Sequence, residues 1–374
     1  MIRICLQLLK EITQNSRVFS LVIITVLLFS IISSCSDSSN DNKDEQHTGW
    51  AISPNSTNGY ASIIYTSNSG KTWVRQGNPF IFADIEIADV SAMNSKTAFV
   101  AGFNTNTNEG VIFRTTDAGK NWQKLTLPQI VNKNNFLCIR TNFNQKIIAG
   151  GNSGMLIMST DKGNSWQEIN IPVPDSSYGV YRVDFDANQR IVAGASNSST
   201  GFNMYYSYDN GASWPISNSK PDEWDGLIDV SWVQGTDIVY AAGAYIGING
   251  IFNVSRDAGK NWTMIDTFPM SHCNAIFAFD SNYIWAGADK MNFARTTNTG
   301  NTWEKQSLNY NAIWTLGISA ISKNELWVVG CNGDGGYTQV STILHSIDSG
   351  ASWEQQTVPD NIPALWRVSF PQIK

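Results

Sequence analysis

The amino-acid sequence predicts an all-β fold, a seven-bladed β-propeller with four-stranded blades, and three observations lead to this prediction. An octapeptide of one pattern occurs seven times, at spacings of 41 to 50 residues. The segments between the copies are short apolar runs or alternate apolar with polar residues, which is typical of strands. The chain also ends on a segment with the pattern of a first strand, and the first repeat lacks such a strand. Repeats that cover one another's apolar faces predict a closed ring of sheets.

The octapeptide reads Ser or Thr, any residue, Asp or Asn, any residue, Gly, any residue, a small polar residue and Trp, as in "TTDAGKNW" at 115–122. The Gly is expected to adopt a positive φ that other residues resist. The Asp or Asn can accept hydrogen bonds from backbone N–H groups of its own turn. The Trp is expected to open the fourth strand and to pack between neighbouring blades. We therefore predict a structural role for Asn68, Gly70, Trp73, Asp117, Gly119, Trp122, Asp161, Gly163, Trp166, Asp209, Gly211, Trp214, Asp257, Gly259, Trp262, Asn298, Gly300, Trp303, Asp348, Gly350 and Trp353.

The repeat from Tyr178 to Ile216 shows the expected strands of one blade. "VYRVDF" at 180–185 and "NMYYSY" at 203–208 alternate, "RIVAGA" at 190–195 is short and apolar, and "WPIS" follows the octapeptide. No segment keeps a helical period, so no helix is expected. The repeat therefore predicts four strands in each blade.

The two ends of the chain are complementary. The first repeat begins with "GWAIS" at 49–53, which matches the second strands, and the chain ends with "LWRVSF" at 365–370, which matches a first strand. We expect the C-terminal strand to complete the N-terminal blade, because this leaves no exposed sheet edge. The propeller is assigned to residues 49–374.

The N-terminus indicates export. Three basic residues precede an apolar run at 18–32, and "ISSC" at 32–35 resembles a bacterial lipobox, so residues 1–34 are predicted to be a lipoprotein signal peptide. Cys35 is the predicted lipidation site, and residues 35–48 the lipidated cysteine with a disordered tether. The alternatives are an ordinary signal peptide with an incidental Cys35, or an uncleaved anchor. We expect a membrane-anchored lipoprotein of the outer membrane that faces the periplasm or the cell surface.

Charge and cysteine content exclude some classes of function. The net charge is −6, and removal of residues 1–35, with three basic residues and one acidic residue, makes it −8. A nucleic-acid partner is not expected, because it requires a basic surface. Cys138, Cys273 and Cys331 have no CxxC spacing and are interpreted as buried small residues. A Cys273–Cys331 disulfide is the one pairing that adjacent repeats could form.

The octapeptide resembles the Asp-box, also called the BNR repeat, and the resemblance extends from about Gly49 to Lys374. This group includes sialidases, xyloglucanases, sortilin-type receptors and photosystem II assembly-factor-like proteins, and the chain is most similar to the last of these. The resemblance implies that the boxes lie on the outer underside, away from the ligand face. It also implies a role in binding or assembly without an established catalytic set. The Phe-Arg-Ile-Pro motif of sialidases is absent.

The ligand face of such propellers consists of the loops that enter the first strands and the loops that join strands two and three. Aromatic residues gather in the entering loops here, and aromatic residues stack on sugars or anchor a partner chain. The alternative is that about half of this set, which also includes Phe82, Phe136 and Tyr310, belongs to the core. The candidate ligand-binding residues are Tyr178, Trp224, Asp225, His272, Trp314 and Trp366.

Charged residues occur at one position of the first strands. Alignment on the last large residue of each strand places five of them together, with Ile276 and Gly317 in the other two blades: Arg367, Asp89, Arg140, Arg182 and Asp229. They are expected to line the central channel, with Asp89 beside Arg140 and Arg367, and Arg182 beside Asp229. One interpretation is a mutually neutralising ring, and the other is an anion site formed by Arg140 and Arg182.

The remaining residues do not define a reaction. Paired carboxylates could hydrolyse a glycosidic bond, but no spacing singles out a pair among Asp84, Glu86, Glu223, Asp225, Asp289 and Asp334. The three histidines, of which His47 lies in the predicted tether, are a poor basis for a metal site, and no cofactor is expected. The sequence favours a non-catalytic scaffold that binds a protein or an extracellular glycan through its ligand face. The alternative is a glycoside hydrolase.

Overall fold

The computed structural model describes residues 46–55, 61–77, 79–131, 134–142, 145–197, 201–218, 226–244, 251–270, 272–288, 292–308, 313–332 and 340–372. The predicted signal peptide, Cys35 and most of the predicted tether lie outside these residues, as do Trp224, Asp225 and Tyr310. The compact unit begins at Gln46, three residues before the boundary that the sequence suggested.

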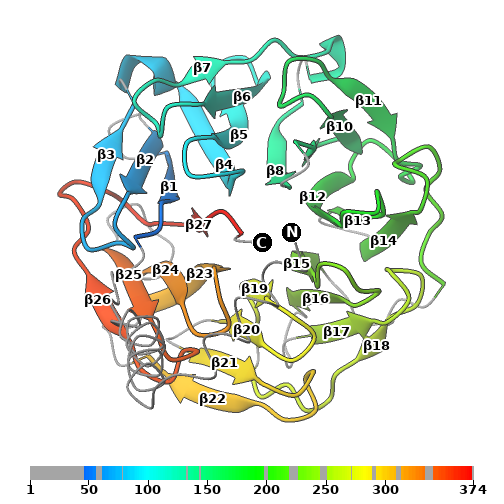
Figure 1. The fold of residues 1–374 in the computed structure, drawn as a ribbon. Helices are drawn as coiled ribbons and strands as arrows, with labels where there is room; N and C mark the ends of the chain where they lie inside the picture. Colours follow the sequence, from blue (N-terminus) through cyan, green and yellow to red (C-terminus); the bar gives the residue numbers. More distant parts are fainter. Residues whose placement is uncertain are drawn as a thin grey trace, which may run out of the picture. The chain divides into compact units, whose positions relative to one another are not determined.

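Seven antiparallel sheets stand around a common centre, so the fold is the predicted all-β seven-bladed propeller (Figure 1). Blades are numbered here in the order of their octapeptides, and the innermost strand of each is given first. Blade 1 contains β27 (Arg367–Ser369), β1 (Gly49–Asn55), β2 (Ala61–Thr66) and β3 (Val74–Gln76). Blade 2 contains β4 (Ile85–Ala92), β5 (Ala98–Asn104), β6 (Gly110–Thr115) and β7 (Gln123–Lys124). Blade 3 contains β8 (Phe136–Thr141), β9 (Ile147–Gly151), β10 (Met155–Ser159) and β11 (Gln167–Asn170).

The other four blades repeat this order of strands. Blade 4 contains β12 (Gly179–Phe185), β13 (Ile191–Asn197) and β14 (Gly201–Ser207). Blade 5 contains β15 (Gly226–Trp232), β16 (Val239–Ala244), β17 (Ile251–Ser255) and β18 (Thr263–Met264). Blade 6 contains β19 (Ala275–Ala278), β20 (Ile284–Gly287), β21 (Asn292–Thr296) and β22 (Glu304–Ser307). Blade 7 contains β23 (Ile313–Ala320), β24 (Leu326–Asn332), β25 (Ser341–Ser346) and β26 (Glu354–Gln356).

Blade 4 departs from the predicted four strands. The segment "WPIS" forms a single bridge, Tyr205 to Ile216, in place of a fourth strand. Pro215 has no N–H to donate and only accepts, from Tyr206 N at 3.1 Å. Two short 3-10 helices, η1 (Pro79–Phe82) and η2 (Gln129–Val131), precede innermost strands. The described part of the chain contains no helix with the length and apolarity that a membrane crossing requires.

The C-terminal strand closes the ring, as predicted. β27 pairs with β1 in the register Ile52 to Arg367 and Trp50 to Ser369, and the two lie side by side in Figure 1. The ring of Phe370 stacks on Trp327 of blade 7 with 3.6 Å between the centroids. The last residues therefore join blade 1 to blade 7.

The hydrophobic core consists of seven clusters, and each lies between two neighbouring blades. The octapeptide Trp of every blade belongs to the cluster that its blade shares with the preceding one. Trp262 of blade 5, for example, packs with Val192 and Met204 of blade 4. The predicted position of these Trp residues between blades is confirmed.

The octapeptide turn is held by its own side chains. In blade 3, Gly163 N donates to Ser159 Oγ at 2.8 Å, and Ser159 Oγ donates to Asp161 Oδ1 at 2.8 Å. All seven glycines have positive φ, between 80° and 92°, as predicted. The sequence analysis missed that the residue before each glycine is also left-handed, with φ between 56° and 65°.

This second left-handed residue ties the octapeptide to the turn between strands one and two. Ala118 N donates to Lys96 O at 2.9 Å, and the equivalent bonds join Lys162 to Gln145 and Ala258 to Asp237. The octapeptides therefore lie at the end of the blades where the innermost strands finish. The loops that enter the innermost strands lie at the other end.

Residues from the predicted tether contact the propeller. Ser69 N donates to His47 O at 2.8 Å, and His47 N donates to Ser69 Oγ at 3.0 Å. The Glu325 carboxylate lies 3.8 Å from His47 Nε2 and 3.1 Å from His345 Nε2. His47 is thus part of the folded unit, at the junction of blades 1 and 7.

Candidate functional site: the central channel

The innermost strands surround the channel with three successive positions of side chains. A β-bulge interrupts β4, β8, β12, β15 and β23. We call the position directly after the bulged residue the charged level. The residue directly before the charged level, which is the bulged residue itself in these five strands, is called the rim level, and the position two residues after the charged level is called the serine level. From blade 1 to blade 7, the charged level is Arg367, Asp89, Cys138, Arg182, Asp229, Ala275 and Gly317.

This register corrects the sequence alignment in two blades. Cys138 pairs with Gly150 as Arg182 pairs with Gly194, so Cys138 and not Arg140 shares the position of Arg182. In blade 6 the position belongs to Ala275 instead of Ile276. The alignment was wrong because β8 and β19 end on Thr141 and Ala278, whereas the alignment assumed a large last residue.

The charged level joins neighbouring blades through the backbone. Asp89 accepts from Ile139 N at 3.0 Å, and Asp229 accepts from Ile276 N at 3.1 Å, so both acids hold the following blade. Arg182 and Arg367 hold the preceding blade, because they donate to the carbonyl oxygens of Leu137 and Leu316. These four charged residues therefore have a structural role, because each connects two neighbouring blades.

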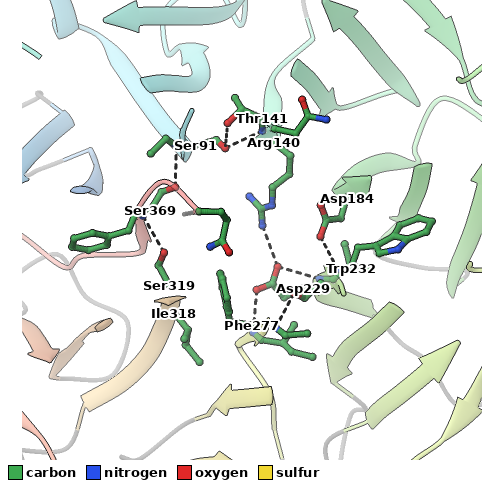
Figure 2. A pocket seen from close by; sticks show the side chains of 18 of the residues that line it. Ser91, Arg140, Thr141, Asp184, Asp229, Trp232, Phe277, Ile318, Ser319 and Ser369 are labelled. Atoms are coloured by element: carbon green, nitrogen blue, oxygen red, sulfur yellow. Dashed lines mark hydrogen bonds and ion pairs between the residues drawn. The ribbon is translucent and has the colours of Figure 1, made fainter. Parts of the chain in front are cut away.

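At the serine level, two residues further along the strands, side chains again form hydrogen bonds to the backbone of the neighbouring blade. It consists of Ser369, Ser91, Arg140, Asp184, Ser231, Phe277 and Ser319. At five of the seven junctions, a hydroxyl or carboxylate oxygen accepts from the backbone N–H of the next innermost strand (Figure 2). The bonds are Ala92 N to Ser369, Thr141 N to Ser91, Trp232 N to Asp184, Ala278 N to Ser231 and Phe370 N to Ser319, at 2.7 to 3.0 Å. Arg140 and Phe277 are the exceptions.

Arg140 reaches across the channel from the serine level to the charged level. Its Nη1 lies 2.8 Å from Asp89 Oδ2, and its Nη2 lies 3.5 Å from Asp229 Oδ1 (Figure 2). Arg182 Nε lies 3.3 Å from Asp229 Oδ1, and Arg367 Nε lies 4.0 Å from Asp89 Oδ1. The predicted opposite-charge neighbours are therefore confirmed.

Three guanidinium groups thus face three carboxylates, because Asp184 also belongs to this network. Burial raises the pKa of Asp184 to about 6, against the opposing effects of Arg140 and of the N–H groups of Trp232 and Phe185. Burial also raises the pKa of Asp229, and Arg182 and Arg140 limit this rise. Removing one member of such a network leaves an uncompensated buried charge.

A cavity of about 400 Å³ occupies the channel. Its walls come from all seven innermost strands, at the charged and serine levels, and from the turns that follow, including Asn142, Gln234 and Gly235. The cavity therefore lies toward the octapeptide end of the propeller. The sequence analysis placed most of its ligand candidates at the opposite end, and of its two anion-site candidates in the channel Arg140 lines this cavity. It missed the serine level, although "DVSA", "DVSW", "GISA" and "RVSF" repeat it in the first strands.

At the opposite end, the structure separates the predicted ligand residues. Tyr178 is only 5% exposed and belongs to the core between blades 3 and 4, and Phe82 and Phe136 are also core residues. His272 and Trp314 are half-buried, whereas Trp366 is 44% exposed. Trp224 and Asp225 lie outside the described residues.

The rim level supplies the exposed side chains at this end. Six of its seven residues are apolar and none of the six is fully buried: Trp366, Ala88, Leu137, Tyr181, Ile228 and Leu316. Tyr181, 38% exposed, was missed as a candidate. Because these six residues occupy equivalent positions of the innermost strands, directly before the charged level, we call them the apolar rim.

Little in the described residues is arranged for catalysis. Asp84 is exposed, and burial raises the pKa of the half-buried Glu86, but the other four candidate carboxylates lie outside the described residues. Within the described ranges, no group of three or more His, Cys, Asp or Glu is placed to hold a metal ion. Cys138, Cys273 and Cys331 are buried free thiols, in agreement with their interpretation as small core residues.

Comparisons with known proteins agree on the fold. The sequence profile of the Sortilin-Vps10 family (Sortilin, neurotensin receptor 3) matches residues 110–224. YCF48 bound to D1 peptide is similar in structure, with a TM-score of 0.56 and 17% identity, over 78% of this chain and 93% of that chain. YCF48 from Cyanidioschyzon merolae gives a TM-score of 0.58 and 15% identity, over 81% and 96%.

A GH74 xyloglucanase from Xanthomonas campestris has a TM-score of 0.61 and 15% identity, over 87% of this chain. The chain covers only 53% of that enzyme. A search of curated proteins finds no match. The protein is a seven-bladed β-propeller that is similar in structure to YCF48 and to a GH74 xyloglucanase, and the comparisons do not choose between a binding function and glycoside hydrolysis.

Proposed function

We propose that the protein is a non-catalytic binding or assembly scaffold that engages a protein partner through the apolar rim. The observation that carries this proposal is the exposure of Trp366 and Tyr181 at equivalent positions of blades 1 and 4. Exposed apolar side chains that gather around a channel mouth are typical of interaction sites. Figure 1 shows the innermost strands β27 and β12, which position them, on either side of the centre.

Two further observations support a scaffold. The channel carboxylates Asp89 and Asp229 are bound by arginines and by backbone N–H groups, so they are not free to act on a substrate. The similar YCF48 structure contains a bound peptide, which makes a peptide segment the first partner to test. We also assign the octapeptide to the Asp-box repeat, because all seven copies act as turns of the framework. We assign the chain to the assembly-factor-like branch of these propellers. A glycoside hydrolase is the alternative.

The binding test uses protein immobilised on beads and exposed to a solubilised membrane extract of the native organism. The variant Trp366→Ala with Tyr181→Ala is expected to lose a defined protein that the wild type retains, with an unchanged thermal melt. The matched control is Val74→Ala with Met264→Ala, which removes exposed apolar side chains from the outermost strands β3 and β18 and should retain that protein. Identical capture by all three proteins, or release of sugars from xyloglucan by the wild type, would contradict the proposal.

Anchoring of the scaffold to a membrane is part of the proposal. The lipobox-like "ISSC" at 32–35 places Cys35 as the acylated residue, and two or more acyl chains give durable attachment. Cells that express the wild type should incorporate labelled palmitate into the protein, and the Cys35→Ser variant should not. Equal labelling of both proteins, or none of either, would remove the anchor from the account.

A further inference from the structure

The cavity at the octapeptide end has a composition that the repeat does not require. Five blades place an acceptor at the serine level and use it to bind the next blade. Arg140 and Phe277 break this rule, and both line the cavity. Positions where a sequence departs from its own local rule are expected to be functional.

Each exception costs a contact between blades. Phe185 N, which would bond to an acceptor at the position of Arg140, is held by Asp184 of its own strand at 2.9 Å. Phe277 has no acceptor atom to offer to Ala320, the residue of blade 7 that corresponds to Ala92 and Phe370. The repeat alone would favour a serine at position 277. The Phe277 ring instead packs beside Trp285, with 6.4 Å between the ring centroids, and also lines the cavity.

The polar wall of the cavity can both donate and accept hydrogen bonds. Ser231, Ser319 and Ser369 accept from backbone N–H groups, and each hydroxyl has its own proton to donate. Asp184 accepts two backbone N–H groups, and a carboxylate has about four acceptor positions. The Arg140 side chain is 24% exposed, so its guanidinium group offers further donors.

The opposite wall is apolar. Phe277 and Phe279 are half-buried and line the cavity together with Ile318, and Figure 2 shows Phe277 and Ile318 across the channel from Arg140. A ligand that fits both walls has one face of C–H groups and an edge of groups that donate and accept. The charges of the network balance, with three guanidinium groups and three carboxylates. A ligand with a net charge would therefore leave an unpaired charge in a confined space.

We propose that this cavity binds a small, uncharged, polyhydroxylated molecule, a monosaccharide or the terminal sugar of a glycan, with Phe277 against its apolar face. Hydroxyl groups donate and accept, as the serines, Asp184 and Arg140 require, and they do not disturb the ion pairs of Arg140. The volume of about 400 Å³ lies within the range of ligand pockets, about 300–1,000 Å³. This site is separate from the apolar rim, so sugar binding here does not depend on whether the rim binds a protein partner.

The test is a titration of the full-length protein with glucose, galactose, mannose, xylose and N-acetylglucosamine, followed by calorimetry and ligand-observed NMR. At least one neutral sugar should bind, and glucosamine and glucuronate, which carry a charge, should bind more weakly. Phe277→Ser should weaken binding about tenfold or more. The variant should remain folded. Its melting temperature should fall because Phe277 packs against the core between blades 6 and 7, and the new hydroxyl, which can accept from Ala320 N, should offset part of this loss.

Two more variants make the result decisive. Asp184→Asn keeps the side-chain size and should also weaken the same sugar, and Tyr208→Ser removes an exposed aromatic residue outside the cavity and should not. A glycan array distinguishes a free sugar from the end of a chain. The proposal is overturned if no neutral sugar binds the wild type, if the charged sugars bind more tightly, or if Phe277→Ser binds normally. It is also overturned if Phe277→Ser unfolds the protein, because core packing alone would then account for the ring at position 277.

Discussion

Deletion of residues 365–374 is expected to abolish the folded propeller. These residues include β27, which pairs with β1, and the buried side chains of Leu365, Val368 and Phe370. Loss of one large core side chain costs about 2–5 kcal/mol, whereas the stability of a whole protein is about 5–15 kcal/mol. The deletion also exposes the edge of β1. Circular dichroism during heating should show no cooperative transition.

The control for this deletion removes residues 373–374 alone, which follow the last paired strand. This protein should melt as the wild type does. A cooperative melt of the longer deletion near the wild-type temperature would show that blade 1 is complete without β27, and the description of ring closure would be wrong.

The second large effect is expected from Trp262→Ala. Trp262 is 5% exposed between blades 4 and 5, and its Nε1 donates to Gly259 O at 3.1 Å and to Ser217 Oγ at 3.2 Å. Replacement of a buried Trp by Ala costs about 3–5 kcal/mol. The midpoint of urea unfolding should fall accordingly.

Trp366→Ala is the matched control, because it makes the same substitution at an exposed position. Its stability should stay within about 0.5 kcal/mol of the wild type. Equal losses of stability in the two variants would mean that exposure does not separate the repeated Trp residues from the rim Trp.

The fold could be predicted because the residues that each blade requires recur together in the octapeptide. A left-handed Gly, a carboxylate that accepts from its own turn and a Trp for the next junction recur together, and few arrangements other than a ring bury seven such Trp residues. Ring closure was visible because "LWRVSF" has a first-strand pattern at the end of the chain.

Local details escaped prediction where one residue changes the geometry. Pro215 reduces the fourth strand of blade 4 to a bridge, although the octapeptide before it is regular. An alignment on large side chains placed Arg140 at the wrong level, because β8 ends on Thr141 instead of a large residue. The β-bulges of the innermost strands were not predicted either. A bulge depends on backbone pairing with the next strand and has no reliable signature in a single strand.

The candidate site was predicted only in part. The pairs Arg182–Asp229 and Arg367–Asp89 were found because their spacing follows the repeat. The pair Arg140–Asp89 was also predicted, but from an alignment that gave Arg140 the wrong level. Tyr178 was a poor candidate because an aromatic residue before a strand can turn into the core as easily as toward solvent. The serine level was missed because single serines carry little weight in sequence analysis, and their role depends on backbone groups of the next blade.

The central claim is that the repeated residues hold the propeller together and that binding belongs to residues outside the repeat. It is tested most directly by measuring the urea midpoint and the capture of the membrane-extract partner for Trp262→Ala and Trp366→Ala side by side, at a temperature where both are folded. We predict that Trp262→Ala loses stability and keeps the partner, whereas Trp366→Ala keeps its stability and captures less. A Trp262→Ala protein that is as stable as the wild type and no longer captures the partner would contradict the claim.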